Sequence, residues 1–125
     1  MSGIEFVRTV AVYVTDIERS IRFFTEQLGF ELKLDAPMGP GRWVQVAPPG
    51  AQTHVVLFPR AMMPGWPEQK ASIVFKCADI LKTNEELKAK GVTFALEPTK
   101  MAWGTFASFE DMDGNTFFLV DAPQP

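Results

Sequence analysis

The fold of this chain is decided by one stretch near its end, Asp111-Met112-Asp113-Gly114-Asn115-Thr116-Phe117-Phe118-Leu119-Val120. Within it, Asp113-Gly114 predicts a two-residue hairpin turn, because such a turn requires positive φ angles that Asp and Gly tolerate. The apolar residues after the turn predict a strand packed against a core. The sequence therefore predicts a β-hairpin that closes the folded part of the chain.

A strand followed by a helix is predicted near the beginning of the chain. Residues 6–14 are apolar and β-branched, and Thr15 or Asp16 can cap the helix that follows. Gly29 ends this helix, since glycine adopts a left-handed terminal conformation at the least cost. Further strands are predicted at residues 30–34, 42–47 and 53–58.

The same order of elements returns in the second half of the chain. A strand is predicted at residues 72–78, and a helix begins after Asp79 and ends at Gly91. Further strands are predicted at residues 92–96, 105–110 and 116–120. The capping residues Asp16 and Asp79 are 63 positions apart, and the two helix-ending glycines are 62 apart. Such regular spacing indicates a duplicated β-α-β-β-β pattern.

The duplication predicts an α+β fold in which the two halves pair, because neither half alone can bury both faces of its sheet. We expect a single domain, residues 1–125, built from two tandem βαβββ modules that form a curved eight-stranded sheet. The modules are predicted at residues 4–58 and 71–121, with a linker at residues 59–70.

Composition excludes several classes of function. The net charge is −3 with no basic stripe, so we expect no nucleic-acid partner. No apolar run approaches the ~20 residues that a membrane span needs, and no secretory signal is visible, so we expect no membrane association. The single cysteine, Cys77, suits a reducing compartment and predicts a cytoplasmic protein.

Two motifs give the chain a resemblance to a known superfamily. Residues 15–24 with Leu28-Gly29-Phe30 resemble the opening signature of the vicinal oxygen chelate superfamily, which contains glyoxalase I, bleomycin resistance proteins and extradiol dioxygenases. Asp111-Met112-Asp113-Gly114-Asn115 is similar to its closing signature, with Met112 in place of the usual proline. The resemblance implies a cup-shaped sheet with the helices outside and a ligand inside.

The resemblance also implies where a metal would bind. Metal-dependent members place His, Gln or Glu at four positions, which correspond here to Thr9, Leu57, Ser72 and Phe118. Because these side chains are poor ligands or cannot bind a metal at all, we expect no metal and no other cofactor. Whether the protein is an enzyme stays open at this point.

A Trp-Gly pair, Trp103-Gly104, occupies the place where bleomycin-type resistance proteins carry one. The resemblance thus favours a metal-independent protein that holds an apolar or aromatic small molecule in the cup by stacking. The residues expected to contact the ligand are Thr9, Arg42, Trp43, Leu57, Ser72, Trp103 and Phe118. Four of them have an alternative role: Trp103 can pack on the sheet edge, Arg42 can be a solvated strand-end residue, and Thr9 and Ser72 can satisfy backbone groups.

The alternative function is a lyase, isomerase or dioxygenase-like enzyme with a divergent metal or acid–base site. It would use displaced residues such as His54, the only histidine, and Glu110. On an alternating strand His54 faces away from Leu57, so we expect it to point out of the cup if Leu57 lines the cup. Members of this superfamily are often dimers, which makes a homodimer one expected assembly.

Overall fold

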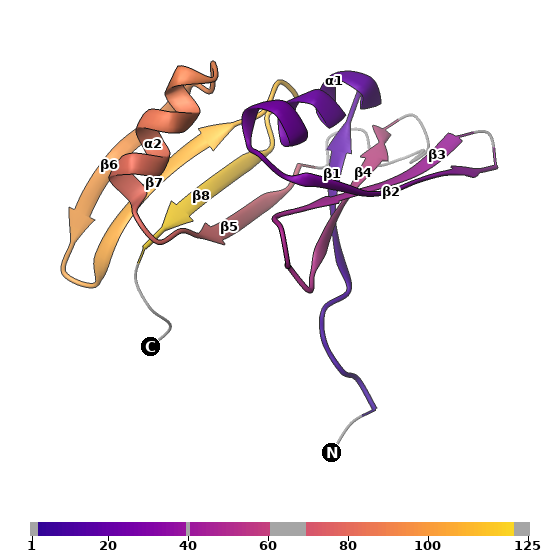
Figure 1. The fold of residues 1–125 in the computed structure, drawn as a ribbon, viewed down its shortest axis with the longest axis horizontal. Helices are drawn as coiled ribbons and strands as arrows, with labels where there is room; N and C mark the ends of the chain where they lie inside the picture. The colour runs from indigo at the N-terminus through magenta and orange to yellow at the C-terminus, as the bar shows by residue number, and fades with distance from the viewer. Residues whose placement is uncertain (1–2, 40, 61–69, 122–125) are drawn as a thin grey trace. The chain divides into compact units, whose positions relative to one another are not determined.

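The structure of the protein is a computed structural model that describes residues 3–39, 41–60 and 70–121. It divides into two compact units, Met1–Gln69 and Lys70–Pro125 (Figure 1). The division falls at the end of the predicted linker, of which residues 61–69 lie outside the described residues. No helix in the described part of the chain is long and apolar enough to cross a membrane.

The N-terminal unit is a four-stranded sheet with one helical segment. Its strands lie in the order β1-β4-β3-β2, with β1 parallel to β4 and the other pairs antiparallel. The elements are β1 (Thr9–Val14), α1 (Ile17–Arg22), the π-helical turn η1 (Phe23–Gln27), β2 (Glu31–Met38), β3 (Gly41–Ala47) and β4 (His54–Pro59).

The C-terminal unit repeats this arrangement. Its strands lie in the order β5-β8-β7-β6, with β5 parallel to β8 and the other pairs antiparallel. The elements are β5 (Ser72–Lys76), α2 (Ile80–Ala89), β6 (Phe94–Met101), β7 (Gly104–Glu110) and β8 (Thr116–Val120). The predicted fold class is confirmed, and the eight strands are hydrogen-bonded as two four-stranded sheets, one in each module.

The helix boundaries follow the predicted signals. Asp16 caps α1, and its side chain accepts a hydrogen bond from the backbone N–H of Arg19 at 3.1 Å. Asp79 caps α2 in the same way, accepting from the N–H of Lys82 at 3.1 Å. Gly29 has a φ angle of +79°, a conformation that other residues adopt at a cost. The π-helical turn after α1 was not predicted, because apolar spacing alone does not distinguish one extra residue in a turn.

One face of the N-terminal sheet lies under α1. Val12, Val44 and Leu57 are in register across β1, β4 and β3, and all three are fully buried. Arg42 has the same parity on β3 as Val44, and its guanidinium binds Glu18 on α1. This ion pair places the helix over the face that carries Leu57. We call the face of the sheet that lies under the helix the helix-side face, and the opposite face of the same sheet the distal face.

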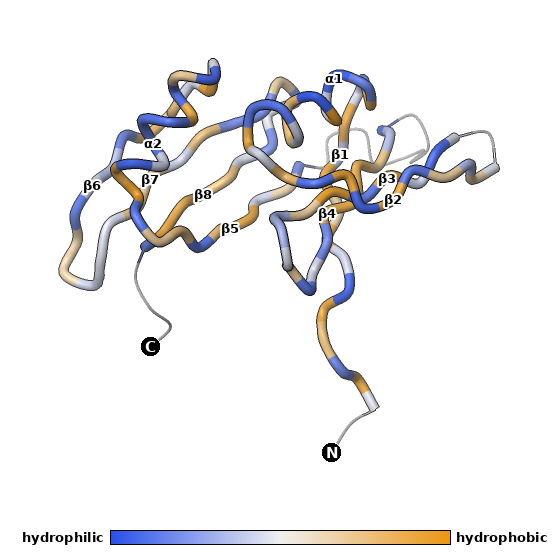
Figure 2. The backbone as a smooth tube through the Cα atoms, viewed as in Figure 1, coloured by the Kyte–Doolittle hydropathy of each residue, from blue (hydrophilic) through white to orange (hydrophobic). Residues whose placement is uncertain are grey.

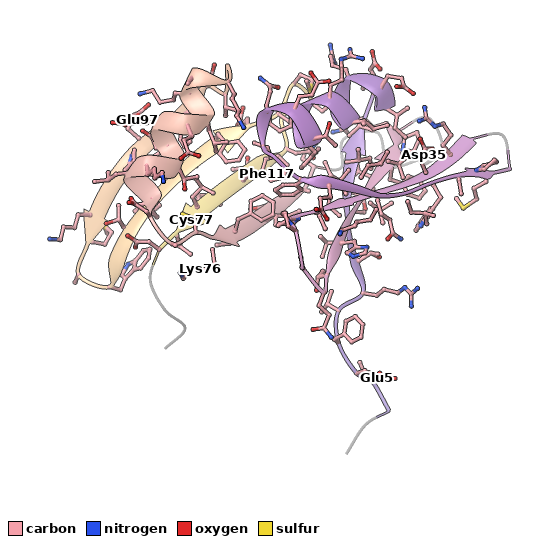
Figure 3. The ribbon with its side chains drawn as sticks, in the orientation of Figure 1. Glu5, Asp35, Lys76, Cys77, Glu97 and Phe117 are labelled. Carbon is pink, nitrogen blue, oxygen red and sulfur yellow. The ribbon has the colours of Figure 1, made fainter. Side chains whose placement is uncertain are left out.

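The helix-side face of the C-terminal sheet carries a row of four aromatic rings, one from each strand. Phe75 and Phe117 have ring centroids 5.7 Å apart, Phe117 and Phe109 5.5 Å, and Phe109 and Phe94 5.4 Å. Phe117 is labelled in Figure 3, and Figure 2 shows the hydrophobic stretch along β8 that contains it. This row forms the core of the module, because ring pairs bury large areas and add specific attraction.

The turn between β7 and β8 differs from the predicted hairpin. Five residues, 111–115, separate the strands, and only Gly114 has a positive φ angle, at +80°. The prediction of a two-residue turn at Asp113-Gly114 was therefore wrong. The loop is held instead by Asp111, whose Oδ1 accepts from the N–H groups of Asp113 and Asn115, each at 2.9 Å.

Asn115 ties this loop to the start of β5. Its Nδ2 donates to Oδ2 of Asp111 at 2.9 Å, and its Oδ1 accepts from the N–H of Ala71 at 2.8 Å. Burial raises the pKa of Asp111 above its ordinary value, and hydrogen bonds from Asn115 and Asp113 partly offset this. The closing motif is thus a hydrogen-bonded clamp.

We predict that Asn115→Ala lowers the free energy of unfolding by about 2–3 kcal/mol, because it leaves buried partners without hydrogen bonds. Met112→Ala, in the same loop but exposed, should change it by less than about 0.5 kcal/mol. Urea denaturation followed by circular dichroism measures both. Equal, small effects of the two substitutions would show that the clamp does not hold the module.

Candidate ligand-binding faces

The distal face of the N-terminal sheet is a grid of three rows across β1, β4 and β3. Strand register places Thr9 beside His54, Ala11 beside Val56, and Tyr13 beside Phe58. Gln45 extends the middle row on β3, because it pairs with Val56. Trp43, two residues earlier on β3, extends the third row. The face therefore has a polar end, a floor of small side chains and an aromatic end.

Three rings form the aromatic end of this face. The ring centroids of Trp43 and Phe58 lie 6.2 Å apart, with the ring planes 86° to each other. The centroids of Tyr13 and Phe58 lie 6.3 Å apart, at 60°. Both are edge-to-face arrangements, the geometry that the ring quadrupoles favour. All three side chains are only partly buried, so they retain surface on which a flat molecule can pack.

The polar end holds the only histidine of the chain in a defined position. Nδ1 of His54 lies 2.8 Å from Oε1 of Gln45. An amide oxygen can only accept, so Nδ1 carries the proton and donates. His54 is thus on the same face as Thr9 and the aromatic rings. His54 does face away from Leu57, as expected, but Leu57 lies on the helix-side face, so the condition under which His54 would point out of the cup does not hold.

The distal face of the C-terminal sheet carries the second set of predicted residues. Ser72 is paired with Thr116, and Phe118 is paired with both Val74 and Ser108. Phe106 pairs with Val120 on the same face. The ring of Trp103 stacks on the ring of Phe106, with the centroids 5.7 Å apart and an interplanar angle of 30°. Trp103 is 55% exposed, so part of its surface remains accessible to a ligand.

Leu57 does not lie on a distal face. It pairs with Val12 and Val44 and is 0% exposed in the core under α1. The residue of β4 that corresponds to Phe118 in the strand register is Val56, one position earlier. Because side chains alternate along a strand, an error of one residue moves the side chain to the opposite face.

Arg42 also lies on the helix-side face and binds two carboxylates. Its Nε donates to Oδ1 of Asp35 at 3.1 Å, its Nη2 lies 2.6 Å from Oδ2, and its Nη1 binds Glu18. Hydrogen bonds from Arg42, together with its positive charge, lower the pKa of Asp35, and hydrogen bonds to Asp35 and Glu18 raise the pKa of Arg42. Asp35 is labelled in Figure 3. The predicted role of Arg42 as a handle for a ligand is not favoured by this geometry.

The structure thus brings Thr9 and Trp43 together on one distal face and Ser72 and Phe118 together on the other. Sequence reasoning missed Tyr13, Phe58 and Gln45. Their strand parity was available as a signal, since each is an even number of residues from Thr9, His54 or Trp43 along its strand. Glu110 pairs with Thr116 and belongs to the C-terminal unit, whereas His54 belongs to the N-terminal unit.

Two other features of the described residues do not form a ligand site. Among residues 3–39, 41–60 and 70–121, no three His, Cys, Asp or Glu side chains cluster where they could hold a metal ion. A hollow of about 370 Å³ opens beside the start of α2. Its carboxylates serve the fold, because Asp79 caps α2 and Asp121 accepts from the N–H of Thr105 at 3.0 Å. The hollow contains none of the predicted ligand residues.

Comparison with known proteins supports the same fold. Residues 7–119 match the family described as the Glyoxalase/Bleomycin resistance protein/Dioxygenase superfamily. Protein YetH of Bacillus subtilis (strain 168) is 51% identical over 119 residues, which cover 94% of this chain and 99% of YetH.

Two solved structures are similar over nearly their whole length. A member of the same superfamily from Sphaerobacter thermophilus DSM 20745 is 35% identical with a TM-score of 0.88, covering 94% of this chain and 98% of that one. TnmS3, an antibiotic binding protein from Streptomyces sp. CB03234, is 33% identical with a TM-score of 0.89, covering 98% of this chain and 100% of that one.

We predict that Arg42→Gln raises the pKa of Asp35 towards the ordinary aspartate value of about 3.9, because the paired positive charge is removed. In the unsubstituted protein the pair stabilises the fold above that value, and this contribution is lost as the pH falls through the lowered pKa. A carbon-detected NMR titration of the Asp35 carboxyl measures the shift. Lys33→Gln is the control and should leave it unchanged; an unchanged Asp35 in both variants would refute the assignment.

Proposed function

Since this chain belongs to the Glyoxalase/Bleomycin resistance protein/Dioxygenase superfamily, we propose that it is a metal-independent protein that binds an apolar or aromatic small molecule. In each unit, taken by itself, a ligand packs on the distal face of the sheet. The observation that carries the proposal is the cluster of Tyr13, Trp43 and Phe58 on the N-terminal distal face. Flat molecules bind such clusters by burying ring surface at a low cost in side-chain entropy.

The C-terminal distal face supports the proposal with a second aromatic surface. Trp103 and Phe106 stack, and Phe118 lies on the same sheet face. Thr9 and Ser72 stand at corresponding places on the two faces and offer hydroxyl groups to polar atoms of a ligand. The proposed contacts are therefore Thr9, Tyr13, Trp43 and Phe58 in one unit, and Ser72, Trp103, Phe106 and Phe118 in the other.

Independence from metal is supported by the residue types on the two faces. Thr9 and Val56 occupy equivalent places to Ser72 and Phe118, and none of the four is a His or a carboxylate. Divalent metal sites in proteins are built mainly from imidazole, thiolate and carboxylate groups. A similar structure, TnmS3, is an antibiotic binding protein, which is consistent with a binding role for this fold.

A second candidate function is an acid–base enzyme, and one observation favours it. His54 lies on the distal face with its Nδ1 held by Gln45, so its Nε2 can accept a proton. The two functions differ in the fate of the ligand: a binding protein returns it unchanged, whereas an enzyme converts it.

Our proposal of a binding protein also retains a homodimer and a cytoplasmic location as expectations.

We predict that the protein binds planar two-ring compounds, such as trans-4-hydroxystilbene, in a buffer that contains EDTA. Trp43→Ala should weaken binding to the N-terminal face about tenfold, and Trp103→Ala should weaken binding to the C-terminal face about tenfold. Each substitution removes a ring worth ~1–2 kcal/mol of stacking and burial. Leu81→Ala, an exposed apolar residue of α2, is the matched control and should bind normally. Isothermal titration calorimetry measures all four affinities, and equal affinity in every protein would refute the site.

We predict that the purified protein retains far less than one equivalent of zinc, nickel, manganese or iron, because the corresponding positions Thr9, Val56, Ser72 and Phe118 offer no imidazole, thiolate or carboxylate. Elemental analysis by plasma mass spectrometry measures the content. One bound equivalent, or a probe affinity that depends on added metal, would favour the enzymatic alternative.

A further inference from the structure

The N-terminal distal face is divided along the strand direction. Thr9 and His54 form its polar end, and Tyr13 and Phe58 form its aromatic end, four residues further along β1 and β4. Four residues of strand span about 13 Å at ~3.3 Å per residue. Ala11 and Val56 lie between the two ends. Val56 is only 2% exposed and Ala11 is partly exposed, so between its two ends the face carries short apolar side chains from β1 and β4.

The histidine at the polar end has a fixed hydrogen-bonding role. Its Nδ1–H donates to Gln45 Oε1, so in the neutral ring Nε2 is an acceptor. Within the described part of the chain no hydrogen bond is recorded for Nε2. Gln45 is itself on the distal face, in the middle row. It therefore holds the imidazole ready to receive a hydrogen bond from a molecule on this face.

The repeat shows that this arrangement is not a general feature of the scaffold. The strand register aligns His54 with Thr116 and Gln45 with Ser108. It aligns Phe58 with Val120 in the same way. The C-terminal face has the same strand pairing but no imidazole–amide pair, and its own rings, those of Trp103, Phe106 and Phe118, are arranged differently. The N-terminal face is therefore specialised, and the repeat supplies a matched control position.

We propose that the ligand of the N-terminal distal face is an elongated aromatic molecule with a hydroxyl or N–H donor at one end. Its ring packs against Trp43, Phe58 and Tyr13, and its donor gives a hydrogen bond to Nε2 of His54. This inference rests on the proposed binding function and deepens it by naming the chemical class of the ligand. It does not depend on any contribution from the C-terminal unit.

Two probes that differ only at the donor test the inference. trans-4-Hydroxystilbene carries a phenolic donor at the end of a rigid two-ring frame, and trans-4-methoxystilbene has the same frame without the donor. Isothermal titration calorimetry on the full chain should show the hydroxy compound binding about three- to tenfold more tightly, the value of one net hydrogen bond.

Three variants locate the source of this preference. His54→Phe keeps a flat ring but has no acceptor, so the ratio of the two affinities should fall to about one. Gln45→Met removes the carbonyl that orients the imidazole and should reduce the ratio. Thr116→Ala, at the repeat position of His54, should leave it unchanged. Circular dichroism melting confirms that each variant is folded, and Gln45→Met keeps the test valid if His54→Phe does not fold.

The outcomes separate this inference from the proposed function. If both probes bind equally and Trp43→Ala weakens both, the aromatic site stands and the role of His54 is overturned. A preference for the hydroxy compound that survives in both His54→Phe and Gln45→Met overturns it as well. Failure of both probes to bind the unsubstituted protein counts against both proposals. Loss of the preference in His54→Phe alongside normal behaviour of Thr116→Ala supports the inference.

Discussion

The burial of one face of each sheet under its helix is the constraint on which the rest of this structure depends. In the N-terminal module, Val12, Val44 and Leu57 are removed from water together, and Arg42 reaches Glu18 on α1 from the same side. Because side chains alternate along a strand, this burial fixes the side chains of the opposite face. The aromatic rings and His54 face away from the helix because their neighbours in sequence must face it. The candidate site is in this sense a consequence of the core.

Duplication gave the protein two copies of one scaffold with different surfaces. The cap, the helix-ending glycine and the parallel pairing of the first strand with the last recur in both modules. The distal faces differ. One has an imidazole–amide pair and three clustered rings, and the other has Ser72 and Ser108 with the rings of Phe106 and Phe118 and a loop tryptophan stacked on Phe106. Side chains of a covered face must fit a core, whereas those of the distal face are free to diverge. The residues that determine which ligand is bound are therefore expected on the distal faces, where the two modules differ.

Much of the fold could be predicted from the sequence because its signals are local. The helix ends are set by residues that interact only with backbone close to them in sequence, namely Asp16, Asp79, Gly29 and Gly91. Because the pattern occurs twice, each of these signals could be recognised in both halves of the chain. The turn after β7 was predicted incorrectly because its geometry depends on Asp111 and on a distant backbone group at Ala71. No local pattern reports such a contact.

The candidate site was only partly predictable for a similar reason. Trp43 and Thr9 were found, but Leu57 was assigned to the wrong face because its place was taken from the resemblance. The register of β4 against β1 determines that face, and a parallel pairing between distant strands is not visible in either strand alone. Arg42 was misassigned because its partners, Glu18 and Asp35, come from two other elements.

The central claim is that ligands meet the distal face of the N-terminal sheet and not its helix-side face. Nuclear Overhauser contacts between bound trans-4-hydroxystilbene and isotope-labelled protein test it most directly, because neighbouring residues on one strand point to opposite faces. The account predicts contacts from the probe to Ala11 and Phe58 and none to Val12 and Leu57. Contacts to Val12 and Leu57 without contacts to Ala11 and Phe58 would contradict it.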